Sequence, residues 1–325
     1  MDLSKYHLER AGPGADWDAL VEASDQGTIF ALSAYLEAIP FRPAYWLCMK
    51  GDQVAGAAAL IETADGTSTQ LAPHVIHGGL MFAPAPPEQV AAMTISEEYR
   101  ITCAMLRDLA ATYRDLAFQG APTLTDLRPL QWHNYGQDGP KVRIDLRYTS
   151  YVPLVPMTGD LPEWPVYLAL NKSRRQSVRY GMKAGITVDQ DATIADFLGL
   201  YRETFARQDV TVPEEEIALL DAVCTALRAQ GRLRLFAARP VDGTLGSISV
   251  WGLDAKRAYY LYGANAPALR EEHCGTMAIF DAFRALAAEG VEEVDMEGIN
   301  SPQRGYFKLS FGGDVRPYPR VHLAQ

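Results

Sequence analysis

The sequence is poor in cysteine, and this excludes both a disulfide-stabilised protein and a cysteine-based metal-binding protein. Only 4 of the 325 residues are cysteine, and none has a second cysteine or a histidine at the spacing of a metal site. They are Cys48, Cys103, Cys224 and Cys274. We therefore expect a reduced, cytoplasmic protein with neither a disulfide framework nor a metal site.

Long apolar runs and glycine-rich phosphate motifs are also missing. No uninterrupted apolar stretch approaches the roughly 20 residues that span a bilayer. Residues 1–10 contain acidic side chains and no apolar segment of a secretory signal. Without a phosphate-binding loop, an ATP-dependent ligase is a poor match. We expect no membrane span.

Basic residues are fewer than acidic ones, which gives a formal net charge of −10. This excludes a protein that coats nucleic acid over a large surface but leaves room for a local basic groove. A hydrophobic fraction of 48% with 22% charged residues is typical of a globular protein. Since single cores usually stop growing below this length, two domains are expected.

The spacing of apolar residues changes repeatedly along the chain and predicts an α+β fold. Helices are expected at residues 17–24, 32–39, 88–114, 163–170, 171–184, 194–207, 214–230 and 270–289. Strands are expected at residues 45–50, 54–62, 75–82, 116–119, 141–146, 151–155, 186–190, 232–238, 244–253, 257–263 and 294–297. Prolines crowd the segment after residue 155, which predicts domains 1–155 and 156–325. Residues 314–325 are expected to form a last strand that packs back on the first domain.

The two halves of the sequence share a pattern. Asp52–Gly56 and Asp242–Gly246 each place an aspartate four residues before a glycine, and each is followed by a strand, a long helix and a short strand that ends in glycine. Those short strands are Ala117–Gly120 and Asp295–Gly298. Neutral residues replace both acids in the first copy. We therefore predict that the second domain is catalytic, whereas the first is non-catalytic and helps to form an acceptor groove.

The stretch from Val294 to Gly313 holds the strongest candidate site. Val294–Glu297 alternates apolar and acidic residues, which predicts a half-buried strand with two carboxylates on one face. After a turn, Arg304–Phe311 places Lys308 between aromatic residues, and two glycines end the segment. These charges are either a catalytic cluster or structural ion pairs with a solvated lysine.

Gly305–Gly313, preceded by Asp295–Gly298, resembles the Phe-Lys-x-x-Phe-Gly signature of the Fem-type (FemABX) peptidyltransferases. Asn171–Ile186 is similar to the basic helix of that family, and Tyr201–Arg207 to its Tyr-x-x-Thr-x-x-Arg segment. The resemblance implies two tandem GNAT-like domains with the acyl-CoA N-acyltransferase fold. Their mixed, mainly antiparallel sheets are flanked by helices.

The resemblance also implies an activity. Fem-type enzymes move an aminoacyl group from aminoacyl-tRNA to an amine of a peptidoglycan precursor, and related tandem-GNAT proteins act on small natural products. The expected partners are the acceptor end of aminoacyl-tRNA and an amine-bearing small molecule or peptide, with no further cofactor. The long charged helical arm of some members is missing, so the acceptor stays open.

Site residues follow from the same resemblance. Lys308 would stabilise the tetrahedral oxyanion or the leaving ribose oxygen. Phe307 would shape the pocket, and either Asp295 or Glu297 would take the proton of the attacking amine. The other substrate-binding candidates are Arg304, Tyr262, Asn300 and Arg207. Arg207 matches the arginine of the family's acceptor pocket, although it would also suit a helix C-terminus.

A basic stripe marks the helix predicted at residues 171–184. Its members, spaced i, i+3, i+7 and i+11, are Lys172, Arg175, Arg179 and Lys183. No acid lies between residues 172 and 188. In an acidic protein such a stripe is a candidate for binding phosphate, of tRNA or of a nucleotide-linked acceptor. The alternative is an ordinary solvated helix face.

An acyl-CoA-dependent GNAT N-acyltransferase is the main alternative. Such enzymes commonly have a glycine-rich loop before the long helix, where backbone N–H groups hold a pyrophosphate. Here Arg270–Ala278 contains one glycine and two acids, which favours a tRNA donor. A non-catalytic GNAT-like binding protein is the second alternative, and the intact Phe307–Lys308 pair argues against it.

Overall fold

The computed structural model describes residues 2–155, 157, 159–206 and 210–324. The chain divides into two compact units. Unit 1 contains Met1–Tyr148 with Pro317–Gln325, and unit 2 contains Thr149–Arg316. The division falls inside β6 (Arg143–Pro153), somewhat before the proline-rich segment at which we expected it. The two strands predicted at residues 141–146 and 151–155 were wrong as separate elements, because β6 runs through both.

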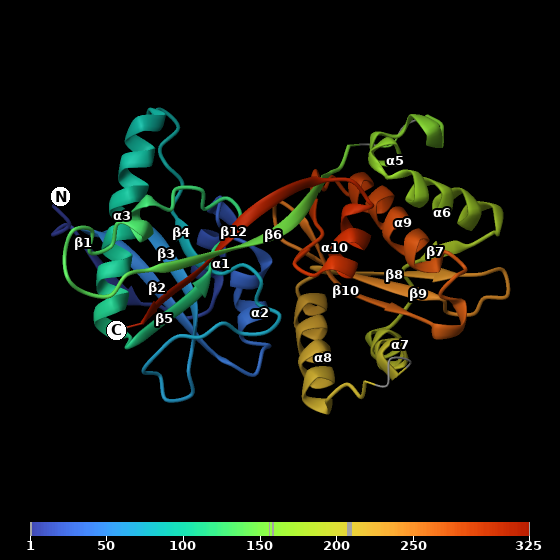
Figure 1. The fold of residues 1–325 in the computed structure, drawn as a ribbon, viewed down its shortest axis with the longest axis horizontal. Helices are drawn as coiled ribbons and strands as arrows, with labels where there is room; N and C mark the ends of the chain where they lie inside the picture. The colour runs from blue at the N-terminus through green and yellow to red at the C-terminus, as the bar shows by residue number, and fades with distance from the viewer. Residues whose placement is uncertain (1, 156, 158, 207–209, 325) are drawn as a thin grey trace. The chain divides into compact units, whose positions relative to one another are not determined.

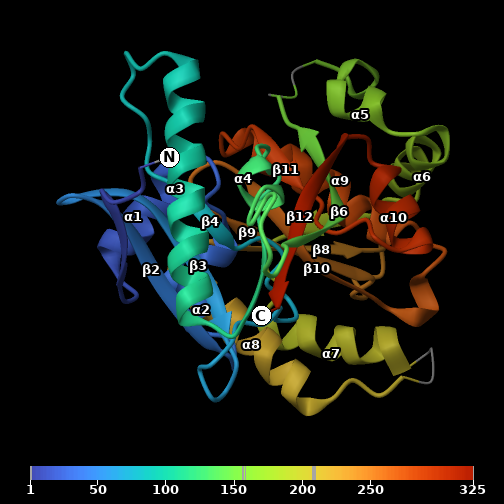
Figure 2. The same cartoon turned by 60° about the vertical axis from the view of Figure 1, so that its left-hand side comes forward.

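Unit 1 is an antiparallel sheet with one long helix along it. The strand order is β1-β2-β3-β4, formed by β1 (Tyr6–Arg10), β2 (Arg42–Lys50), β3 (Gln53–Glu62) and β4 (Gly79–Phe82). Helix α3 (Ala91–Thr112) lies along this sheet (Figure 2). The remaining elements are α1 (Ala15–Ala23), the 3-10 turn Ile29–Ala31, α2 (Ser33–Leu36), β5 (Asp115–Gln119) and α4 (Arg128–Gln131). Strand β5 pairs antiparallel with β12 (Asp314–Ala324).

Strand β1 was not predicted, because it is short and Tyr6 is its single buried residue. The helix α3 was predicted well, since its buried residues recur at helical spacing. Ile101, Met105 and Leu109 follow one another at i, i+4 and i+8 and are all buried.

Unit 2 is a mixed sheet with helices on both faces. The strand order is β6-β11-β10-β9-β8-β7. Its further strands are β7 (Thr187–Asp189), β8 (Leu233–Arg239), β9 (Ser247–Leu253), β10 (Ala258–Asn265) and β11 (Glu293–Asp295). Helices α6 (Lys172–Lys183) and α9 (Cys274–Ala288) lie on one face, and α7 (Ile194–Ala206) and α8 (Glu214–Ala229) on the other (Figure 1). Short helices are α5 (Pro165–Ala169) and α10 (Pro302–Leu309), with 3-10 turns at Leu161–Glu163 and Pro267–Leu269.

Strands β10 and β11 run parallel but pair over two residues only, Ala258 with Val294 and Tyr259 with Asp295. Strand β11 then ends, whereas β10 continues to Asn265. The chain beyond Asp295 is therefore free to leave the plane of the sheet. This divergence sets the place of the candidate site.

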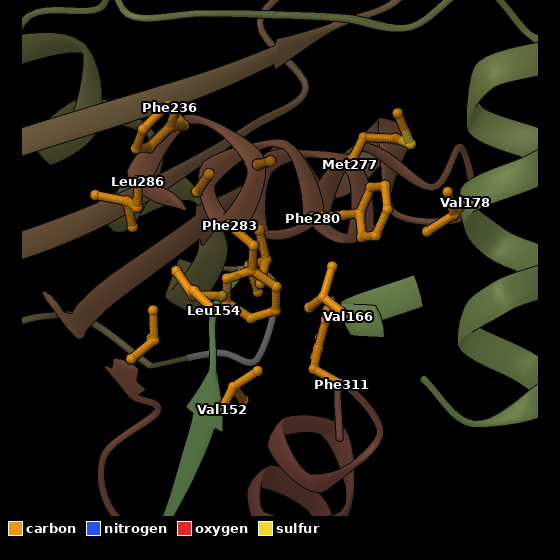
Figure 3. Close-up of a cluster of buried hydrophobic side chains, with 14 of the residues drawn as sticks. Val152, Leu154, Val166, Val178, Phe236, Met277, Phe280, Phe283, Leu286 and Phe311 are labelled. Carbon is orange, nitrogen blue, oxygen red and sulfur yellow. The ribbon is translucent and has the colours of Figure 1, made fainter. Parts of the chain in front are cut away.

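The core of unit 2 anchors the segment that carries Lys308. Phe280 and Phe283 of α9 lie in one buried cluster with Val152 of β6 and with Phe311, which follows α10 (Figure 3). Phe283 and Phe311 meet edge to face, with 5.9 Å between ring centroids. Burial of one such ring stabilises the fold by about 1.5–3 kcal/mol. Phe311 thus fixes the C-terminal end of α10 to the core.

The predicted helix 270–289 begins later than expected. A 3-10 turn at Pro267–Leu269 precedes it, and His273 adopts a left-handed conformation with φ 66°. These features break the first turn, so α9 starts at Cys274. Within the described residues, no helix is both long and apolar enough to cross a membrane.

Candidate active site

Asp295 ends β11 and is fully buried. Its Oδ1 atom accepts hydrogen bonds from the Thr149 hydroxyl of β6 and from the Glu297 backbone N–H, the latter at 2.7 Å. The predicted half-buried strand over 294–297 was therefore wrong in part. The strand stops at Asp295, and Val294 and Met296 are both fully buried. Asp295 holds the turn that follows, rather than sharing a strand face with Glu297.

Glu297 lies in this turn with a left-handed φ of 56°. For a residue other than glycine this conformation costs about 1–2 kcal/mol. The side chain is only 7% exposed, and its Oε1 atom has no hydrogen-bond partner among the described residues. Burial raises the pKa of Glu297 well above its usual value; Asp295 adds to this, whereas Lys308 opposes it. Burial therefore makes the Glu297 carboxyl harder to ionise than an ordinary glutamate.

Lys308 is the cation whose charge opposes the rise in the pKa of Glu297. It lies in α10, partly buried, with Nζ 5.5 Å from the centroid of the Tyr260 ring. Burial lowers the pKa of Lys308, and the charge of Arg304 adds to this; Glu297 and Asp295 oppose the shift. Helix α10 starts with Pro302, as first helical turns often do.

The other predicted substrate-binding residues lie in different surroundings. Phe307 contacts Phe311 edge to face, with 5.3 Å between centroids. Tyr262 stacks on Phe197 of α7 rather than on the charged cluster. The exposed Arg304 lies in α10, and the half-buried Asn300 in the loop before it. Arg207 lies outside the described residues.

The predicted basic stripe lies on α6, with Lys172, Arg179 and Lys183 exposed and Arg175 partly buried. The Asn171 side chain caps the helix by accepting a hydrogen bond from the Arg174 N–H at 2.8 Å. The stripe is therefore on the solvent side of a well-formed helix.

Sequence reasoning missed Arg174, which lies on the inner side of α6. Its guanidinium carbon is 4.7 Å from the Phe307 ring centroid and 4.8 Å from that of Phe311. Its Nε donates to Ser310 Oγ at 3.0 Å and its Nη1 to Thr276 Oγ1. A signal was present. Arg174 shares the i, i+4, i+7 face with the buried Val178 and Gly181.

Arg174 also lines a cavity of about 390 Å³ beside the start of α9. The other lining residues are Ser177, Thr204, Asn265, Ala266, Pro267, Arg270, Glu271, His273, Gly275, Thr276 and Phe307. The segment 270–278, which contains a single glycine, thus lies beside this cavity. Besides the acid Glu271, two arginines face it.

Thr149 was missed as well, and Tyr260 was not chosen among the tyrosines of its strand. Thr149 is 146 positions from Asp295 in sequence, and no local pattern links the two residues. Tyr260 belongs to a tyrosine-rich strand from which we singled out Tyr262. A register shift between Tyr260 and Tyr262 in the β9–β10 pair alters the alternation there.

Residues 170–308 match the family described as Acetyltransferase (GNAT) domain. The crystal structure of FemX has a TM-score of 0.63 and 14% identity, covering 96% of this chain and 96% of that one. A tandem GNAT protein from the clavulanic acid biosynthesis pathway has a TM-score of 0.53 and 12% identity, covering 98% of each chain. The chain has the tandem GNAT fold.

L-PGS from Bacillus licheniformis is a further structure similar to this tandem GNAT chain, with a TM-score of 0.52 and 11% identity, covering 96% of this chain and 93% of that one. No curated protein matches the sequence. The predicted α+β fold and the resemblance to Fem-type proteins are confirmed at the level of fold. The GNAT family match ends at Lys308 and includes Asp295, Glu297 and Arg174.

Proposed function

We propose that this tandem GNAT protein is an amide-forming aminoacyltransferase, which moves an aminoacyl group from aminoacyl-tRNA to an amine. The GNAT fold and the family match support an acyltransferase. The observation that carries the finer proposal is the buried Glu297, whose Oε1 atom has no hydrogen-bond partner among the described residues, together with the partly buried Lys308, whose charge opposes the rise in the pKa of Glu297. A buried acid–base pair suits aminolysis, because the reaction needs a proton acceptor and a stabilised oxyanion.

In the proposed reaction the acceptor amine attacks the carbonyl carbon of the aminoacyl ester. A new C–N bond forms, and the carbonyl oxygen becomes an oxyanion that faces the Lys308 ammonium. Glu297 takes the proton that the attacking nitrogen must lose. When the C–O bond to the ribose breaks, the leaving oxygen receives that proton, so the products are an amide and a free ribose hydroxyl.

Asp295 has a different role in this scheme. Its Oδ1 atom is already engaged by Thr149 and by the Glu297 N–H, so we assign it to positioning rather than to proton transfer. It stabilises the left-handed turn that directs the Glu297 side chain. Of the two acids that the sequence left open, Glu297 is therefore the proposed base.

The donor proposal is supported by the basic stripe on α6. Three of its four cations are exposed in a protein of net charge −10. The phosphates of a nucleic-acid backbone bind favourably to such a local row of cations. The proposed partners are the acceptor end of a charged tRNA and an amine-bearing small molecule or peptide. No further cofactor is proposed, and the use of aminoacyl-tRNA implies action in the cytoplasm.

A transfer assay tests this function. Total tRNA charged with isotope-labelled amino acids is incubated with the protein and a panel of amine acceptors, and labelled amides are detected by mass spectrometry. We expect a product with the wild type and a loss of about 10²–10³-fold with Lys308→Ala, which must keep the wild-type circular dichroism spectrum. Unchanged turnover of Lys308→Ala would remove Lys308 from the mechanism.

The cavity beside α9 favours a second candidate, an acyl-CoA-dependent N-acyltransferase. Arg174 and Arg270 line it, and guanidinium groups are well suited to bind the phosphates of coenzyme A. A thermal-shift panel of acyl-CoA compounds separates the two. Stabilisation by an acyl-CoA together with amide formation from it would favour this second candidate.

A further inference from the structure

We infer that Thr149 is a positioning residue for the proposed reaction: its hydroxyl holds Asp295, and through Asp295 it fixes the backbone turn that directs Glu297. The inference rests on the proposed function, in which Glu297 takes the proton of the attacking amine. It gives a role to β6, a strand in which the sequence pointed to no site residue.

The register of β6 places Thr149 beside that turn. In the antiparallel pair of β6 with β11, Tyr151 lies opposite Asp295. Two residues further along, the same register would set Thr149 opposite Glu297. Strand β11 ends at Asp295, whereas β6 continues. Thr149 therefore lies past the last residue pair, at the point where the chain after β11 turns away.

The Glu297 backbone N–H has to find an acceptor outside the sheet. Pairing of β10 with β11 stops at Tyr259 and Asp295, so this ladder does not reach Glu297. A buried N–H group without a hydrogen bond is unfavourable. The Oδ1 atom of Asp295 accepts from it at 2.7 Å, and the same oxygen accepts from the Thr149 hydroxyl. One carboxylate oxygen thus links the turn to β6.

A threonine suits this position. Thr149 is fully buried, and branching at Cβ restricts its side chain to few rotamers, so the hydroxyl keeps one direction. Glu297 has a left-handed φ of 56°, a conformation that persists in a residue other than glycine only when surrounding contacts fix it. Without the Thr149 hydroxyl, Asp295 loses a donor that orients its carboxylate. We therefore expect the turn to relax and the Glu297 side chain to become more exposed to water.

Urea unfolding of the full chain tests this without any substrate. Burial raises the pKa of Glu297, so the urea midpoint of Glu297→Gln is expected to rise relative to that of its parent as pH increases from about 4 to about 8. In a Thr149→Val background this relative rise is expected to disappear, because the carboxyl is no longer buried. Thr149→Ser keeps the hydroxyl and is expected to keep the rise.

The titratable side chains that interact with Glu297 are Asp295 of β11, Lys308 of α10 and Tyr260 of β10. All three remain in every variant, so a change in the pH dependence reports on Glu297 itself. Thr149→Ala removes the same hydroxyl with less bulk and gives a second measurement should Thr149→Val not fold. Circular dichroism verifies the fold of each variant.

Thr102→Val is the matched control. Thr102 is also a buried threonine, but its hydroxyl donates to the Glu98 carbonyl within α3, at 2.8 Å. The control is expected to lower the urea midpoint equally at every pH, to leave the relative rise of Glu297→Gln intact, and to leave turnover unchanged.

Kinetics test the link to the reaction. Thr149→Val is expected to lower kcat about 10–10²-fold, since a small displacement of a catalytic group is costly, with little change in KM for the acceptor amine. The rising limb of the pH–rate profile is expected to move to lower pH, toward that of an ordinary glutamate. Thr149→Ser is expected to restore most of kcat and the position of the limb.

The outcomes separate this inference from the proposed function. A relative rise of Glu297→Gln that is the same in the Thr149→Val background would overturn control of Glu297 by Thr149. Wild-type kcat and an unmoved limb in Thr149→Val would overturn its role in the reaction. Absence of any transfer by the wild type would refute the proposed function, whereas the urea comparison would still decide whether Thr149 positions Glu297.

Discussion

Glu297 joins a left-handed backbone to a buried carboxylate oxygen without a hydrogen-bond partner among the described residues. Features of this kind are unfavourable for folding and gather at functional sites. By contrast, the Oδ1 atom of Asp295, two residues earlier, accepts two hydrogen bonds. The contrast between two neighbouring acids is the reason to assign proton transfer to one and positioning to the other.

The first prediction concerns the rate and its dependence on pH. Glu297→Gln keeps the shape of the side chain but removes the base, so turnover is expected to fall about 10²–10⁴-fold. In the wild type, the rate is expected to rise with pH as Glu297 loses its proton, at a pH above the usual range of a glutamate. Steady-state rates across a pH series from acidic to mildly basic check this. A rising limb that persists unchanged in Glu297→Gln would assign the base elsewhere.

The same variant predicts a change in stability. Because folding raises the pKa of Glu297, the folded state holds this proton more tightly than the unfolded chain. The corresponding stability is present at low pH and is lost as pH rises through the raised pKa. Unfolding by urea is therefore expected to show that Glu297→Gln gains stability relative to the wild type as pH increases above about 4. Parallel stability curves would mean that Glu297 is not a buried acid.

Tyr260 and Gly263 give a third residue-level prediction. A Cβ atom on Gly263 would overlap the Tyr260 hydroxyl, and the Tyr260 ring faces the Lys308 ammonium. Gly263→Ala is expected to displace the ring and lower kcat/KM several-fold, with little loss of stability because a flexible side chain can move. Tyr260→Phe removes the overlapping atom, so Gly263→Ala is expected to cost less in that background. Additive effects in the double-mutant cycle would contradict this coupling.

At the scale of elements, α10 depends on a close approach at Gly305. A Cβ atom there would lie 2.6 Å from the Ile299 carbonyl oxygen, and backbone cannot easily yield. Gly305→Ala is expected to destabilise the protein by about 1–3 kcal/mol and to lower turnover, because α10 carries Lys308. Urea unfolding and rate measurements check both effects.

Gly199 in α7 is the matched control, since a Cβ atom there meets nothing within 4 Å. Gly199→Ala is expected to stabilise the helix by about 0.5–1 kcal/mol and to leave turnover unchanged. Equal effects of the two substitutions would show that the approach of Gly305 to Ile299 has no special importance.

The basic stripe of α6 yields a prediction for RNA binding. Arg179→Gln with Lys183→Gln removes two exposed cations from one helix face. The affinity for tRNA is expected to fall, and the slope of log K against log salt concentration to decrease by about 0.7–0.9 for each phosphate that the variant no longer neutralises. Filter binding across a salt series measures this. An unchanged slope would return α6 to an ordinary solvated helix.

Elements with a clear period were predictable, and conformations set by tertiary contacts were not. The apolar stripe of α3 and the basic α6 are visible in the sequence itself. The left-handed turn at Glu297 is bonded to Asp295, whose Oδ1 atom also accepts from Thr149, which β6 brings from a distant part of the chain. His273 shortened α9 through a backbone angle that no composition rule indicates. Arg174 was within reach, because its face of α6 is the apolar one.

At the scale of the whole molecule, the repeated order of strands, long helix and short strand predicted a tandem fold. That prediction holds because each repeat must bury its own helix against its own sheet. The order of strands, long helix and short strand therefore occurs once in each repeat. The limits of the units were harder to foresee. Strand β6 continues through residues 147–150, where polar side chains alone do not show that Thr149 and Ser150 are buried.

The central claim is that the donor is an aminoacyl-tRNA. Its most direct test is capture of a charged tRNA pool by the purified protein, with deacylated tRNA and a coenzyme A panel measured in parallel. We predict RNase-sensitive enrichment of particular charged tRNAs, which would also name the amino acid transferred. Stabilisation by an acyl-CoA, with no tRNA enriched, would contradict the account.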